Sequence, residues 1–133
     1  MTKKKFIVDT LLYPAKILIL YRWKKEETLE LLQKMKYGKE MLDAVKEDGF
    51  EERFYGTAYH TQNENGTGEY LLIIHKYKDE EEMNEVLVHE TNHLASYIAT
   101  RHGFIEEMEA TAYLQEYLFK EIKKGLKDGK RSK

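Results

Sequence analysis

Hydrophobic residues in the first third of the chain follow two different spacings. Pro14 precedes an almost continuous apolar run from Ala15 to Tyr21, which is typical of a buried strand. From Thr28 to about Lys36, leucine and methionine recur at helical spacing. The pattern therefore predicts a strand followed by a helix with a core-facing stripe.

The middle of the chain has the pattern of a β-hairpin. Strand-like segments from Phe54 to His60 and from Glu69 to Tyr77 flank a connection rich in Asn, Glu and Gly. Within that connection, the Asn65-Gly66 pair suits a tight turn. With the first strand, the hairpin brings the expected sheet to about three strands.

The second half of the chain predicts two long helices joined by a turn. Asp79 is placed to cap the first helix, and Glu80-Glu81-Glu82 favours its first turn through the helix dipole. Arg101-His102-Gly103 supplies the turn, and the second helix runs from Ile105 to about Lys124. One sector of the first helix carries four apolar residues, namely Met83, Leu87, Leu94 and Ile98.

This order of elements predicts an α+β fold, in which a sheet packs against the two long helices. The chain has 133 residues, which is enough for one sizeable core and too few for two ordinary domains. We expect residues 1–125 to form a single domain. Residues 126–133, rich in Lys and Gly, are expected to be a basic flexible tail.

Composition limits the classes of partner. Hydrophobic residues make up 41% of the chain and charged residues 35%, and the formal net charge is −2. This balance favours neither nucleic acid nor a membrane as the main partner. The chain has no cysteine, and its first apolar stretch, Phe6 to Leu20, is interrupted by charged residues and Pro14, unlike a secretory signal. A cytoplasmic location is expected.

The motif that specifies chemistry is His89-Glu90-Thr91-Asn92-His93, an HExxH sequence. Residues four apart lie above one another on a helix, so His89 and His93 can hold one zinc ion while Glu90 projects beside them. The two histidines also share a sector of the helical wheel away from the apolar one. The alternative is that both are polar residues on a solvated helix face.

A catalytic zinc ion usually takes three protein ligands, so a third is expected from the next helix. Glu109 is the first choice, because the small residues Ala110 and Ala112 would let the two helices approach closely. Glu106 and Glu116 are the fallbacks.

Two further segments extend this motif. Residues 109–118 read E-A-T-A-Y-L-Q-E-Y-L, and Gly56-Thr57-Ala58-Tyr59 begins a predicted strand. Together with HExxH, they resemble small gluzincin-type zinc metallopeptidase-like proteins of bacteriophages and prophages. The resemblance implies a minimal zincin-like fold, with His89, His93 and Glu109 as zinc ligands and Glu90 as the base. More distantly, the chain is similar to ImmA/IrrE-type regulatory metallopeptidases, whose downstream Phe-Ala and Leu-Met-Pro pattern is absent here.

The expected function is that of a zinc metallopeptidase, which hydrolyses a peptide or protein substrate with a zinc-bound water activated by Glu90. Tyr113 and Tyr97 are the candidates to stabilise the oxyanion. The remaining histidines, His60, His75 and His102, are not expected to be ligands. An extended peptide could add to a free edge of the sheet as another strand.

Two other functions fit the same residues. One is a catalytically silent zinc-binding interaction protein, because fold does not determine function. The other is a nucleic-acid-associated protein that uses the basic ends of the chain, Lys3-Lys4-Lys5 and 123–133.

Overall fold

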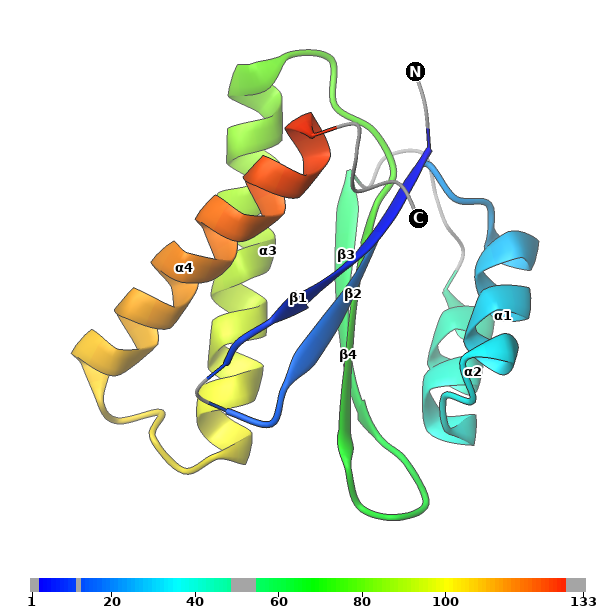
Figure 1. Cartoon of the computed structure of the whole chain (residues 1–133), viewed down its shortest axis with the longest axis horizontal. Helices are drawn as coiled ribbons and strands as arrows, with labels where there is room; N and C mark the ends of the chain where they lie inside the picture. The colour runs from blue at the N-terminus through cyan, green and yellow to red at the C-terminus, as the bar shows by residue number, and fades with distance from the viewer. Residues whose placement is uncertain (1–2, 12, 49–54, 129–133) are drawn as a thin grey trace.

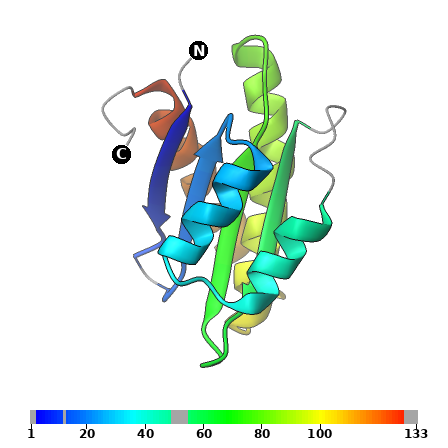
Figure 2. The same cartoon turned by 90° about the vertical axis from the view of Figure 1, so that its right-hand side faces the viewer.

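The computed structural model describes residues 3–11, 13–48 and 55–128, and these form an α+β fold around a mixed sheet. Figures 1 and 2 show the sheet in the middle, with one pair of helices on each of its faces. The strands are β1 (Lys4–Asp9), β2 (Lys16–Tyr21), β3 (Gly56–Gln62) and β4 (Gly68–Ile74). The helices are α1 (Lys25–Lys34), α2 (Lys39–Glu47), α3 (Glu80–Arg101) and α4 (Met108–Lys127).

The strands are arranged in the order β1-β2-β4-β3. The outer pairs, β1 with β2 and β3 with β4, are antiparallel, whereas the central pair, β2 with β4, is parallel. β2 and β4 read as nearly uninterrupted apolar runs because both of their faces are covered by helices. β3 is an edge strand, so only one side of its backbone pairs with another strand. β3 also contacts α3.

Two hydrophobic cores lie on opposite faces of the sheet. Successive residues of β2 point to opposite faces, so Ile17 and Ile19 belong to one core while Leu18 and Leu20 belong to the other. The core under α1 and α2 contains Leu18, Leu20, Leu32, Met41, Val45, Tyr59, Leu71 and Ile73. The larger core under α3 and α4 includes Phe6, Ile17, Ile19, Leu72, Ile74, Leu87, Leu94, Ile98, Leu118 and Ile122.

Several predicted elements are confirmed with small shifts at their ends. The first strand is β2, the hairpin is β3–β4, and the first helix is α1. The turn between β3 and β4 contains Gly66 at a φ of 81°, a conformation that favours glycine. Phe54, with which the hairpin was expected to begin, lies outside the described residues.

The predicted count of about three strands is wrong, because four are present among the described residues. The additional strand, β1, buries only Phe6 and Val8 and is otherwise polar or exposed, so its apolar pattern is weak. Helix α2 was also not predicted. Its first N–H groups, those of Gly38 and Lys39, donate to carboxylates of the β3–β4 region rather than to a local cap, namely Glu69 and Glu64.

The predicted ends of α3 are confirmed. The carboxylate of Asp79 accepts a hydrogen bond from the N–H of Glu82 at 2.8 Å, which caps the helix. After α3, Gly103 has a φ of 79° and reverses the chain toward α4. Helix α4 continues to Lys127, so Leu126 of the predicted tail is a buried helical residue. Among the described residues, no helix is sufficiently long and apolar to cross a membrane.

Candidate metal centre

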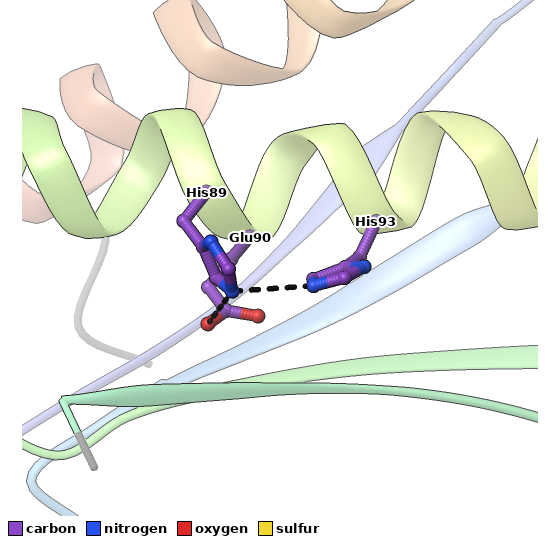
Figure 3. A group of neighbouring side chains, drawn as sticks. All are labelled: His89, Glu90 and His93. Atoms are coloured by element: carbon purple, nitrogen blue, oxygen red, sulfur yellow. Dashed lines mark hydrogen bonds and ion pairs between the residues drawn. The ribbon is translucent and has the colours of Figure 1, made fainter.

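Three side chains of the HExxH motif converge on one side of α3. Figure 3 shows His89, Glu90 and His93 projecting from this helix toward β3, while α4 is drawn on the other side of α3. The Nε2 atoms of His89 and His93 lie 3.2 Å apart, and one carboxylate oxygen of Glu90 lies 4.0 Å from Nε2 of His89. The predicted juxtaposition of the three residues is confirmed.

The register of α3 determines where these side chains point. Leu87, Leu94 and Ile98 are fully buried in the larger core, so the helix cannot rotate without exposing them. Because 3.6 residues make one turn, His89 and His93 emerge together from a different side. The side chain of His89 is 70% exposed, and His93 is partly exposed. Both imidazoles can therefore be reached from solvent.

The spacing of the two imidazoles fits a metal ion. Two nitrogens bound to a tetrahedral zinc ion at about 2.0–2.1 Å are separated by about 3.3 Å, close to the 3.2 Å found here. The same separation also permits an N–H···N hydrogen bond between neutral imidazoles. Together, His89, Glu90 and His93 form a group that could hold a metal ion, with their possible ligand atoms all within 4.8 Å of one another.

Glu90 is unlike its two neighbours, because it is only 6% exposed. Burial raises the pKa of its carboxyl group, while the two nearby imidazoles and a hydrogen bond from the backbone N–H of Ala58 oppose this shift. The hydrogen bond joins Glu90 to the edge strand β3. A buried carboxylate held beside two histidines has the position expected of a general base.

Gly56 permits this close contact between β3 and α3. A Cβ atom at this position would lie 3.1 Å from Cγ1 of Val86 and 3.3 Å from Cγ of Glu90. Both distances are shorter than ordinary van der Waals contact. The glycine therefore lets the start of β3 approach Glu90, while the next residues of the strand continue the sheet.

A row of aromatic rings extends from the site along α3 and onto β3. The ring of Tyr97 lies between those of His93 and His60, with centroid distances of 6.1 and 5.4 Å. On its other side, His60 stacks on Tyr70 at 4.9 Å. Burial lowers the pKa of His60, and the positive charge of Arg101 lowers it further. His60 is thus a packed strand residue, and the ring of Tyr97 lies beside that of His93.

The structure does not bring Glu109 into the group. It lies in the first turn of α4 and is exposed, and the described residues that share the site are His89, Glu90 and His93. Of the two fallbacks, Glu106 is exposed before α4, and Glu116 pairs with Lys120 at 3.2 Å. Among the described residues, the third ligand is therefore not preassembled with the histidines.

Tyr113, a predicted site residue, and the histidines that were not expected to be ligands lie outside the group. Tyr113 is 67% exposed on α4. His102 caps the end of α3 and lies 5.7 Å from the ring of Tyr13. His75 follows β4, and burial lowers its pKa. Neither of these histidines, nor His60, belongs to the group around His89.

Two hollows open on either side of His89. One, of about 590 Å³, is lined by residues of α3 and by Gln115 of α4. The other, of about 500 Å³, lies between α3 and the start of β3 and is lined by Tyr55, Gly56, Val86, Glu90 and others. Glu85 lines both hollows and was not predicted as a site residue. Its position four residues before His89 could have indicated that the two side chains are neighbours on the helix.

Comparisons of this chain with protein-family models, with curated proteins and with solved structures find no match.

Proposed function

We propose that this chain is a zinc-dependent metallopeptidase. The observation that carries the proposal is the 3.2 Å separation of the His89 and His93 Nε2 atoms, with the buried carboxylate of Glu90 beside them. When bound, a zinc ion supplies a Lewis acid that polarises a peptide carbonyl and makes water more acidic. The resemblance to small gluzincin-type proteins of phages and prophages supports the same class.

Each residue of the site has a separate role in the proposed reaction. His89 and His93 hold the metal through their Nε2 atoms. Glu90 removes a proton from the attacking water and delivers it to the nitrogen of the leaving amine. Its hydrogen bond from Ala58 keeps the carboxylate oriented toward the cleft while the proton moves. Tyr97 packs beside His93 and restricts the orientation of that imidazole.

The edge strand β3 suits an extended substrate. The backbone N–H of Ala58 points to Glu90, and that of Gln62 donates to Glu40, so both point away from β4. Directions alternate along an antiparallel strand, and the N–H and C=O of His60 therefore point to the same outer side. A peptide that pairs with this edge would lie next to the histidines, which supports a peptide or protein substrate.

Glu109 is our proposed third ligand. It is exposed in the first turn of α4, on the side of α3 away from the histidine pair, so ligation requires the start of α4 to move as well as a new rotamer. Glu106 and Glu116 are the alternatives on the same segment. Substitution of each, followed by measurement of bound zinc, separates the three.

The direct test of catalysis is hydrolysis of a mixture of denatured proteins by the zinc-loaded chain, read as new amino termini. We expect cleavage that stops on chelation and returns with added zinc. His89→Ala should be inactive, whereas His102→Ala, a histidine at the end of the same helix, should be active. Cleavage that persists in His89→Ala would come from a contaminant and would remove the support for the proposal.

A second function, a zinc-binding interaction protein without turnover, is favoured by one observation. Glu109 lies outside the group of possible ligands, and an open set of two histidines is less preorganised than a complete catalytic site. For this alternative, zinc binds stoichiometrically and no peptide is cleaved.

A further inference from the structure

Glu85 holds a distinctive position beside the candidate metal centre. It lies on α3 one turn before His89 and lines the hollows on both sides of that histidine. The first hollow also contains Glu81, and the second contains Glu82 and the buried Glu90. Among the described residues, no lysine or arginine lines either hollow. The acidic side chains among the described lining residues are therefore not matched by a lysine or arginine in the same two hollows.

The stability of α3 does not explain Glu85. Glu80 to Glu82 lie in the first turn, where negative charge is favourable because of the helix dipole, but this effect falls off beyond that turn. Glu80 in addition forms ion pairs of 3.1 Å with Lys123 and Lys127. Glu85 forms no ion pair in the described part of the chain, and it faces like charges three and four residues earlier. Such spacing destabilises a helix unless a cation lies nearby.

The walls of the hollows suit a long basic side chain. Val88 lines the first hollow, and Val86 and the ring of Tyr55 line the second. Lysine and arginine pack their methylene groups on apolar surface of this kind and direct the charged end to carboxylates. Lys76 and Lys78 line an adjoining hollow that shares Tyr55 and Glu82 with the second one, and the Lys76 ammonium lies 5.6 Å from the centre of the Tyr55 ring.

We propose that Glu85 is a specificity-determining residue that selects substrates with a lysine or arginine next to the scissile bond. The proposal rests on the peptidase function, because it assigns the chemistry of the substrate to the two hollows of that same site. Glu81 and Glu82 strengthen the negative potential, while Glu85 is the carboxylate common to both hollows.

The test measures peptide binding apart from catalysis. Zinc-loaded Glu90→Gln protein, which lacks the proposed base, is titrated into short fluorescein-labelled peptides of Ala, Gly and Ser that differ only in two central residues: Arg, Gln or Glu. We expect the Arg peptide to bind roughly fivefold more tightly than the Gln peptide, and the Glu peptide most weakly. Adding Glu85→Gln should remove this order. The matched control, Glu30→Gln, removes one exposed carboxylate from α1 on the opposite face of the sheet and should keep it.

Three results overturn the proposal: no binding of any peptide, equal binding of the three peptides, or a preference that survives Glu85→Gln. Hydrolysis by the parent protein is measured separately. If the parent cleaves peptides without regard to basic residues, the specificity proposal fails and the peptidase function stands. If the basic peptides bind through Glu85 but none is cleaved by the parent, the peptidase function fails and recognition of basic segments stands.

Discussion

The Nε2 atoms of His89 and His93 lie 3.2 Å apart across one turn of α3. This distance is close to the separation of two nitrogen ligands in a tetrahedral zinc site. The burial of the apolar residues of α3 sets the rotation of the helix, so that both imidazoles face the edge strand β3. Glu90, which comes directly after the first histidine, is tied to that strand through Ala58. The geometry of the site thus depends on the packing of one helix against one strand.

Replacing Glu90 with glutamine should abolish hydrolysis while leaving zinc bound. The amide oxygen can still accept the hydrogen bond from Ala58, but an amide cannot take a proton from water. We expect the rate of peptide cleavage to fall by at least about 100-fold with an unchanged zinc content. Both quantities are measured on the same preparation. A Glu90→Gln protein with full activity would contradict the role of Glu90 as base.

Replacing Gly125 with alanine should destabilise the fold. A Cβ atom there would overlap the ring of Phe6, so α4 and β1 would have to move apart. Although alanine normally favours a helix over glycine, we expect the free energy of unfolding in urea to fall by about 1–3 kcal/mol. Phe6→Leu in the same chain should recover part of this loss, because the two sites are in contact. An unchanged or increased free energy would contradict the packing of β1 under α4.

Acid should weaken the fold through two partly buried histidines, His60 and His75. Burial lowers the pKa of His60 and of His75 below the value of about 6.5 in the unfolded chain. Between the folded and unfolded values the unfolded chain binds more protons, so stability falls as the pH falls below about 6.5. We expect the loss of unfolding free energy between about pH 7.5 and 5.5 to be smaller in His60→Gln/His75→Gln than in the parent. Equal losses would show that these histidines are not responsible.

The two long helices have acidic residues at their N-caps, and these should differ in importance. The side chain of Asp79 accepts a hydrogen bond from Glu82, whereas Glu107 before α4 makes no side-chain cap bond. Asp79→Ala should therefore lower the free energy of unfolding by about 1 kcal/mol, and Glu107→Ala should change it little. Thermal unfolding of both variants provides the comparison. An equal effect of the two substitutions would be inconsistent with the capping of α3 by Asp79.

Local patterns were sufficient for the central parts of the fold. A short stretch of sequence was enough to predict three features: the apolar run of β2, the Asn-Gly turn of the hairpin and the apolar sector of α3. β1 was missed because only Phe6 and Val8 of its six residues face the core. α2 was missed because Glu69 and Glu64, distant in sequence, satisfy its first N–H groups.

The same distinction applies to the candidate site. His89, Glu90 and His93 are neighbours on a single helix, so helical geometry alone predicts their convergence. The distance from Glu109 to this group depends on how α4 crosses α3, which local spacing does not determine. The contacts of Glu90 with Ala58 and Gly56 likewise require that β3 lie next to α3. Contacts within one helix could therefore be predicted from the sequence, whereas contacts between α3, α4 and β3 could not.

The metal content of the purified chain after reconstitution with zinc tests the central claim most directly. We predict one zinc ion per chain in the parent, loss of the metal in His89→Ala and Glu109→Ala, and retention in Glu106→Ala, Glu116→Ala and the control His102→Ala. Retention in Glu109→Ala alone would transfer the role of third ligand to another residue. A parent chain without stoichiometric zinc, or a His89→Ala chain that binds as much zinc as the parent, would contradict the assignment of the HExxH helix as a metal centre.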